Sequence, residues 1–176
     1  VSFSFIFISF SLIAEPTLEE VVVSARKVDE SVQDVPIAMS VFTASDINDA
    51  GIERPEDFIA LTPNVVMANT VNVGDTLVTI RGLTSTRDAE SNFAFVVDGV
   101  LQTNPNAFNR ELLDIAQIEV LKGPQGALYG RNATSGAILI TTKAPSDEPE
   151  SSAVVGMGIN NSSKLQYVNS SKMGDN

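Results

Sequence analysis

Short apolar runs separated by polar and glycine-rich stretches make up most of the chain, which predicts strands rather than long helices. Residues 93–97 are continuously apolar and predict a strand buried on both faces. Between residues 35 and 41, apolar side chains alternate with Pro36, Ala38 and Ser40, which predicts a half-buried strand. Further strands are expected at 65–67, 76–81, 118–121 and 137–142.

Two short helices are expected after the half-buried strand. Ser45 is the expected cap of a helix over 46–50, and Pro55 is the expected start of the second helix. In the second helix, Phe58 and Leu61 are three residues apart and are expected to share the inner face.

Turns and loops are predicted where glycine and polar residues gather. Asp98 and Gly99 both tolerate positive φ, so they predict a tight hairpin turn. Residues 124–136 are studded with glycine and can hold at most one helical turn. The stretches 83–92 and 102–111 are expected to be polar loops.

The two ends of the chain have their own patterns. Residues 1–14 are uncharged, rich in Phe and Ile, and shorter than the roughly 20 residues of a membrane-spanning helix. We interpret them as part of a secretory signal with Ala14 before the cleavage site, although a buried strand stays open. No basic segment and no Met precede them, so the signal is expected to be partial. At the other end, 154–159 and 165–168 predict a hairpin after an acidic linker at 145–150.

Composition removes several classes of chemistry. The chain has no Cys and no His, which excludes disulfides, thiolate catalysis, Ser-His-Asp catalysis and most zinc sites. A net charge of −11 argues against nucleic-acid binding, which needs a basic surface. Residues 15–57 carry eleven acidic and three basic residues, whereas 81–143 carry six of each. We interpret this as a solvated first part and an enclosed second part, with simple surface solubility as an equal alternative.

A short strand is expected near the start, where Val21, Val22 and Val23 follow Glu19 and Glu20. The polar residues 26–34 separate it from other apolar runs, so it is a candidate for pairing with another chain. An ordinary edge strand of the following domain fits the pattern equally well.

Four motifs, in one order, resemble a known family. The segment Ile118–Lys143 contains IEVLKGPQGALYG followed by an apolar strand, and it closely resembles the plug domain of TonB-dependent outer-membrane receptors. Thr79–Gly82 and Val96–Val100 resemble the other plug signatures of that family, and Glu20–Ala25 resembles its TonB box. The resemblance extends over about 15–146.

The resemblance implies an α+β fold, namely a small mixed-sheet plug domain with short helices, followed by the first strands of a truncated transmembrane β-barrel. The implied domains are a partial signal peptide at 1–14, the TonB box and periplasmic linker at 15–34, the plug at 35–146, and a linker with the start of the barrel at 147–176. The chain would not be an enzyme. It would lie in the outer membrane, plugging the barrel lumen, with its N-terminus in the periplasm.

The resemblance also implies site residues and partners. The chain would take up a ferric siderophore or a similar scarce nutrient, with no cofactor and no metal ligands of its own, and TonB with ExbB and ExbD would pull the N-terminal box after strand addition. The residues expected to bind TonB are Glu20, Val21, Val22, Val23, Ser24 and Ala25. Those expected at the substrate are Arg87, Asn92, Gln102, Asn104, Asn106 and Arg110, and those expected between plug and barrel are Arg81, Lys122 and Arg131.

Three other functions stay open at this point. A periplasmic binding module could use the plug fold without a barrel. A secreted α+β enzyme would need a nucleophile and base that no recognised motif supplies. A signalling receptor would carry an additional domain before the box.

Overall fold

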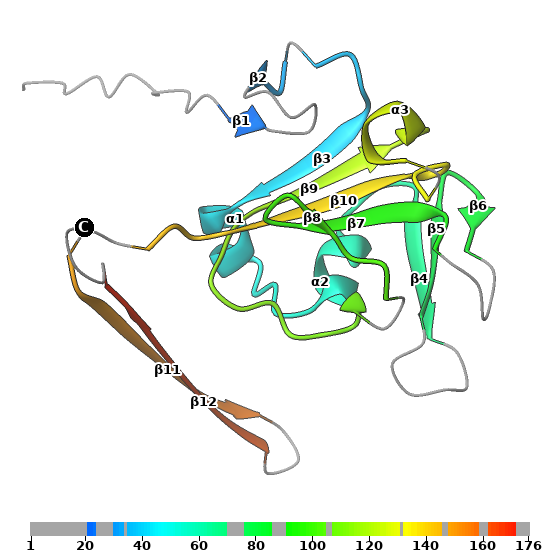
Figure 1. Cartoon of the computed structure of the whole chain (residues 1–176). Coiled ribbons are helices and arrows are strands. Elements are labelled where there is room, and N and C mark those ends of the chain that lie inside the picture. Colours follow the sequence, from blue (N-terminus) through cyan, green and yellow to red (C-terminus); the bar gives the residue numbers. More distant parts are fainter. Residues whose placement is uncertain are drawn as a thin grey trace, which may run out of the picture.

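The computed structural model describes residues 21–23, 30–33, 35–69, 76–85, 91–104, 107–130, 132–145, 148–158 and 162–171 (Figure 1). The strands in the first half of the chain are β1 (Val22–Val23), β2 (Glu30–Ser31), β3 (Met39–Thr43), β4 (Val65–Asn69), β5 (Thr76–Ile80) and β6 (Leu83–Thr84). The later strands are β7 (Phe93–Val97), β8 (Val100–Leu101), β9 (Ile115–Lys122), β10 (Gly136–Thr142), β11 (Glu150–Gly158) and β12 (Ser162–Ser170). The helices of the described residues are α1 (Ala44–Asp49), α2 (Pro55–Ala60) and α3 (Gly126–Tyr129).

A mixed sheet forms the centre of the molecule. Its described strands follow the order β3-β9-β10-β7-β8, with β10 parallel to β7 and antiparallel to β9. Because β7 and β10 lie inside the sheet and both faces are covered, their sequences are almost continuously apolar, as predicted for 93–97. The α+β fold with short helices is therefore confirmed.

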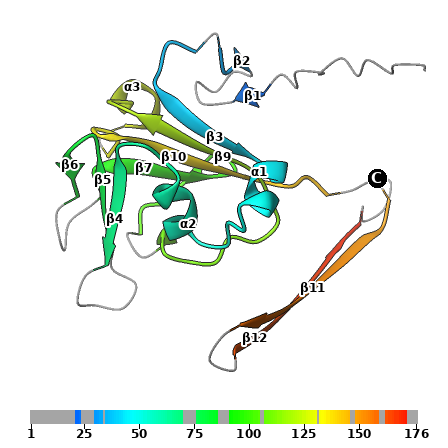
Figure 2. The same ribbon diagram turned by 180° about the vertical axis from the view of Figure 1, so that it is seen from behind.

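One face of this sheet forms the main core, with α1 and α2 beside it (Figures 1 and 2). Phe108 lies at its centre, with its ring centroid 5.1 Å from that of Phe95, 5.2 Å from Phe93 and 6.3 Å from Phe58. These rings meet edge to face, which is the favourable arrangement of aromatic quadrupoles. The aromatic cluster packs α2 against the sheet.

A smaller sheet of the described residues, ordered β4-β5-β6, packs beside α2. Val65 pairs with Ile80, and both side chains are buried in the main core. Leu83 and Thr84, expected in a loop, instead pair with β5 as the short strand β6. This pairing follows a turn at Arg81 and Gly82, which both have positive φ.

The tight turn at Asp98 and Gly99 is confirmed, with φ of 47° and 79°. Asp98 also uses its carboxylate to hold a neighbouring strand. Its Oδ1 accepts from the Thr142 amide at 2.8 Å, and its Oδ2 accepts from Thr142 Oγ1 at 3.0 Å. The β7–β8 turn is thereby fastened to the end of β10.

Two helix details differ from the sequence prediction. The cap of α1 is Thr43 rather than Ser45, because Thr43 and Asp46 form a reciprocal capping box in which the Asp46 carboxylate accepts from the Thr43 amide at 2.8 Å. Thr43 Oγ1 also donates to the Asp46 carboxylate at 2.7 Å, and this bond, together with the one from the Thr43 amide, lowers the pKa of Asp46. At the second helix, Leu61 lies beyond the last turn and is 53% exposed, so Phe58 shares the buried face with Ile59 instead.

The half-buried strand starts later than predicted, at Met39, because Pro36 has no amide hydrogen to give to a ladder. It is an edge strand that pairs with β9 from Met39–Leu121 to Thr43–Gln117. All five of its residues are half-buried, which confirms that part of the prediction.

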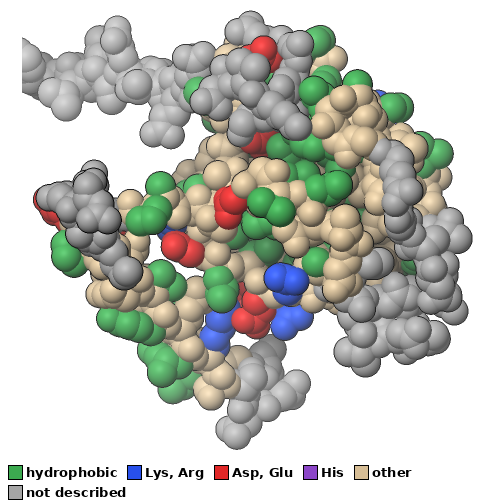
Figure 3. Space-filling view, in the orientation of Figure 1, with side chains coloured by type: hydrophobic (Ala, Val, Ile, Leu, Met, Phe, Trp, Pro, Cys, Tyr) green, Lys and Arg blue, Asp and Glu red, His purple; other side chains and the backbone are tan. Residues whose placement is uncertain are grey.

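The predicted hairpin is present as β11 and β12, with Val155 opposite Leu165 and Ala153 opposite Tyr167. Leu165 and Tyr167 are exposed, whereas Lys164 and Gln166 are partly covered. Lys164 Nζ lies 2.9 Å from Glu53 Oε1, just before α2. The hairpin therefore turns a polar face toward the rest of the chain and leaves an apolar face outside, seen as green side chains in Figure 3.

Candidate functional site

The first strand, β1, which we call the leading strand, and its neighbour β2 lie on the face of the central sheet opposite α1 and α2 (Figures 1 and 2). Val22 pairs with Ser31 and Val23 with Glu30, in an antiparallel ribbon. The Val32 amide donates to the Val21 carbonyl at 3.1 Å. The expectation that this strand is isolated within its own chain is therefore wrong at Val21–Val23, since residues seven to eleven positions later pair with it.

The leading strand is anchored to the sheet by one side chain and one carbonyl. Val23 is 1% exposed and Val22 is 48% exposed, so only Val23 is buried. The Val22 carbonyl accepts from Gln117 Nε2 at 3.0 Å, and the same nitrogen donates to Glu119 Oε1 at 3.2 Å. Few bonds thus connect β1 to the sheet.

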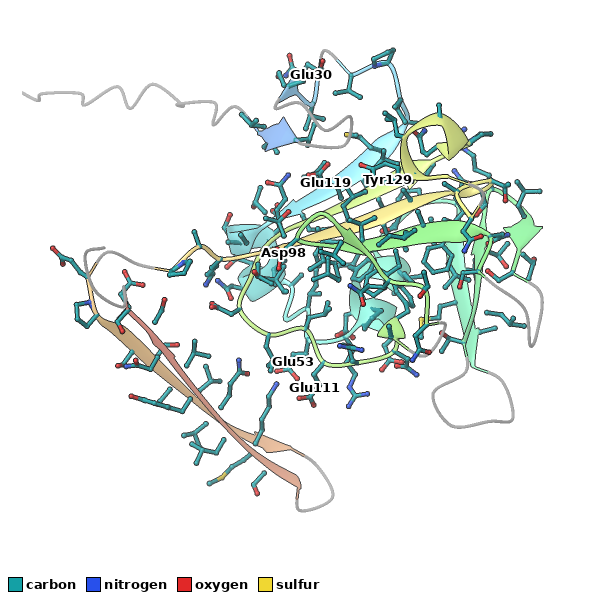
Figure 4. The ribbon with its side chains drawn as sticks, in the orientation of Figure 1. Glu30, Glu53, Asp98, Glu111, Glu119 and Tyr129 are labelled. Carbon is teal, nitrogen blue, oxygen red and sulfur yellow. The ribbon has the colours of Figure 1, made fainter. Side chains whose placement is uncertain are left out.

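Glu119 and Tyr129 lie on this same side of the sheet (Figure 4). Glu119 is 1% exposed, and Tyr129 packs against the small core of that face, formed by the residues Ala94, Val96, Leu121, Ala133, Ala137 and Leu139. Burial, together with the Glu119 charge, raises the pKa of Tyr129 above its ordinary value of about 10. This face of the sheet, which we call the polar face, therefore contains a buried carboxylate and a half-buried tyrosine, whereas the main core on the other face contains phenylalanine rings.

Of the residues predicted to bind TonB, Glu20, Ser24 and Ala25 lie outside the described residues, Val22 and Val23 form β1, and Val21 directly precedes it. Gln117 and Glu119 were not predicted. The signal for Glu119 was available, because it is a charged residue inside the otherwise apolar run Ile118–Leu121. Gln117 gave no local signal, since its role depends on a residue 95 positions away.

Asn92 is occupied by contacts within the chain. Its side chain accepts from Ser85 Oγ at 2.7 Å and donates to the Leu83 carbonyl at 3.1 Å. Its carbonyl accepts from the Ser135 amide at 2.9 Å. Asn92 therefore joins β6 to the segment before β10.

Gln102 and Arg110 come together at one groove of about 320 Å³. Its floor is apolar and includes Phe95, Leu112 and Ile140. Gln102 also lines a much smaller hollow of about 10 Å³ with Asn104, on the scale of a single water molecule.

The other predicted substrate residues, Arg87 and Asn106, lie outside the described residues.

The predicted plug–barrel residues have separate positions. Lys122 donates to Ser40 Oγ at 3.0 Å and lies 3.5 Å from the Pro63 carbonyl, so it joins β9 to neighbouring parts of its own domain. Arg81 is exposed and its guanidinium lies beside Gly123, which has a φ of +121°. Arg131 lies outside the described residues.

The described residues contain no cluster of acidic side chains able to hold a metal ion. Within the same residues, none of the helices has the length and apolar character needed to cross a membrane.

Comparison with known proteins places these features in a family. Residues 31–137 match the model of the TonB-dependent Receptor Plug Domain. The chain is 31% identical over 136 residues to the pesticin receptor of Yersinia enterocolitica, covering 77% of this chain and 20% of that receptor. It is 27% identical over 165 residues to the vitamin B12 transporter BtuB of Vibrio vulnificus, covering 90% of this chain and 26% of the transporter.

A solved receptor structure has a similar fold. The ferric yersiniabactin uptake receptor FyuA from Yersinia pestis superposes with a TM-score of 0.72 at 28% identity, covering 79% of this chain and 22% of that one. The chain thus spans about a fifth to a quarter of the length of its relatives. The family consists of receptors and transporters, so the prediction that the chain is not an enzyme is confirmed. The family model covers more than half of the sequence, and the chain belongs to the TonB-dependent receptor plug domain family.

Proposed function

We propose that this chain is the plug of an outer-membrane receptor that takes up a ferric siderophore or a similar scarce nutrient, and that TonB drives the uptake. The observation that carries the proposal is the position of β1. This strand lies outside the main core, and the described residues hold it there through a two-residue pairing, the Val32–Val21 backbone bond, one side-chain hydrogen bond and one buried valine. A strand held in this way can leave the sheet while the main core stays intact.

Residues 20–25 act as the TonB box in this proposal. A partner strand can pair with an extended segment through backbone hydrogen bonds, which make few demands on sequence. TonB, working with ExbB and ExbD, then pulls the segment from the periplasmic side. The acidic stretch 15–57, which contains the box, suits that solvated side.

The β11–β12 hairpin is the start of the barrel wall in this proposal. The strands of a membrane barrel alternate between an apolar face toward lipid and a polar face toward the lumen. Leu165 and Tyr167 form the apolar side here, whereas Lys164 points to Glu53 of the plug. Because the ion pair is partly exposed and contributes at most about 1 kcal/mol, it does not lock the plug in place.

The nutrient binds at the outward loops in this proposal. The groove at Gln102 and Arg110 combines an apolar floor with a hydrogen-bonding amide and a cation, which suits an anionic organic chelate. Glu111 also lines the groove, and its carboxylate lies 3.5 Å from the Arg54 guanidinium, which offsets its charge. Asn92 contributes by fixing the neighbouring loop, and Arg87, Asn104 and Asn106 complete the set expected from the sequence. Arg81, Lys122 and Arg131 remain the candidates that steady the plug against the barrel.

The test is Val21→Pro in the full-length receptor, because the amide of Val21 points to the same edge as its carbonyl, which pairs with Val32. Proline removes a backbone donor that strand pairing with TonB needs, so uptake of the radiolabelled nutrient should be lost while nutrient binding to whole cells stays unchanged. Val21→Ala keeps the backbone donor and is the matched control, with uptake near the unmodified level. Normal uptake by the proline variant would overturn the TonB-box assignment, and recovery of the full-length product in the periplasmic fraction would favour a barrel-less binding module.

A further inference from the structure

The strand assigned to TonB has both of its edges occupied in this structure. Consecutive carbonyls of a strand point to opposite edges. The Val21 carbonyl accepts from the Val32 amide at 3.1 Å on one edge. The Val22 carbonyl accepts from Gln117 Nε2 at 3.0 Å on the other. A partner strand that arrives at either edge would have to displace a hydrogen bond that already exists within the chain.

The β2 strand has the geometry that a partner strand would have. Glu30 and Ser31 lie antiparallel to Val23 and Val22 in regular register. The ribbon is short, with two residue pairs, and such a ribbon is only marginally stable without further support. Support comes from the buried Val23 side chain and from Gln117.

Gln117 is oriented for this contact by Glu119. A carboxylate accepts hydrogen bonds, so the Gln117 amide must turn its nitrogen toward Glu119 Oε1, at 3.2 Å. The second hydrogen of the same nitrogen then points at the Val22 carbonyl. Because Glu119 is almost completely buried, this orientation is built into the sheet rather than formed by a mobile surface group.

We propose that Gln117 is a positioning residue that holds the leading strand closed, and that TonB binds this strand by exchange with Glu30–Ser31 rather than by simple addition. The inference rests on the proposed function for the identity of the partner. Release of the Gln117 contact and displacement of β2 both precede productive pairing. The population of the open strand then limits the apparent affinity for TonB.

Two variants test the closed form, one at each edge of the leading strand. Gln117→Met removes the donor to Val22 with little change in shape, and Val32→Pro removes the donor to Val21 without touching Glu119. Removal of one neutral hydrogen bond should increase the open population about fivefold. Hydrogen exchange of the Val23 amide, measured on the 176-residue chain, should therefore become about fivefold faster in each variant. Unchanged exchange in both variants would overturn the proposal.

The matched control is Thr79→Val, which removes a side-chain hydrogen bond to Thr84 in the smaller sheet. Val23 exchange should keep its original rate in this variant. A thermal melt of each variant separates local opening from general unfolding. If Gln117→Met unfolds the chain because Glu119 loses a donor, Val32→Pro still decides the outcome.

Binding of the purified periplasmic domain of TonB gives the second readout. We expect about fivefold tighter binding to each single variant and about 25-fold to the double variant, if the two edges act independently. Faster Val23 exchange without tighter binding would support the closed strand but overturn exchange with TonB, together with the assignment of 20–25. The two readouts thus distinguish failure of this inference from failure of the proposed function.

Discussion

The two faces of the central sheet are covered by different kinds of side chain. The face toward α1 and α2 is filled by large apolar side chains, and among the described residues five phenylalanine rings are linked through Phe58 and Phe108. The opposite face has a smaller buried cluster of alanine, valine and leucine side chains, a buried carboxylate at Glu119, and the docked strand β1. Large rings that interlock resist separation, whereas a ribbon of two residue pairs opens at low cost. The stable core and the strand that we propose to be released therefore lie on opposite faces of one sheet.

Phe58→Ala should have the largest effect, because it opens a cavity at a fully buried ring. The free energy of unfolding, measured by urea titration, should fall by about 4 kcal/mol. Val23→Ala shortens an equally buried side chain on the other face and should lower global stability much less, since β1 opens independently of the sheet. Equal losses in the two variants would remove the distinction between the faces.

Gly136→Ala should have a smaller but clear effect. An added Cβ at Gly136 would collide with the Leu121 carbonyl oxygen and lie 3.1 Å from Ile80 Cδ1, so β10 could not keep its distance from β9. The stability loss in the same titration should be about 2 kcal/mol. Gly126→Ala is the matched control, because nothing lies within 4 Å of its added Cβ and its φ is ordinary. A larger loss at Gly126 than at Gly136 would contradict the close approach of these strands.

Titration of Tyr129 should give the smallest effect and should report on the polar face alone. Its raised pKa means that the folded state disfavours tyrosinate. The corresponding stability is therefore complete below pH of about 10 and is lost as the pH rises through the higher folded-state pKa. Tyrosinate absorbance should show Tyr129 ionising at higher pH than a free tyrosine. Glu119→Gln should bring this pKa down, but burial should keep it above the ordinary value.

Features set by neighbouring residues could be predicted from the sequence. The strand 93–97 and the turn at Asp98–Gly99 follow from an apolar run and two residues that tolerate positive φ. The α1 cap was misplaced by two residues, because Thr43 and Ser45 both carry hydroxyl groups and only the reciprocal bond of Asp46 selects between them.

Features set by distant residues could not be predicted. The ribbon β1–β2 has too few residues to give a periodic pattern, and Gln117 meets Val22 only after the sheet has formed. Asn92 is a polar loop residue, which suggested a ligand, but its amide is occupied by Ser85 and Leu83. Similarly, Lys122 joins β9 to Ser40, a partner that no local pattern indicates.

The pairing of β3 has a consequence for how the protein is made. Among the described strands, β3 pairs only with β9, so Met39–Thr43 has no sheet partner until Ile115–Lys122 has left the ribosome. Until then this stretch exposes a bare strand edge, the kind of surface on which chains aggregate. Nascent chains that stop before β9 should therefore depend on chaperones, and that dependence should end once the β3–β9 pair closes.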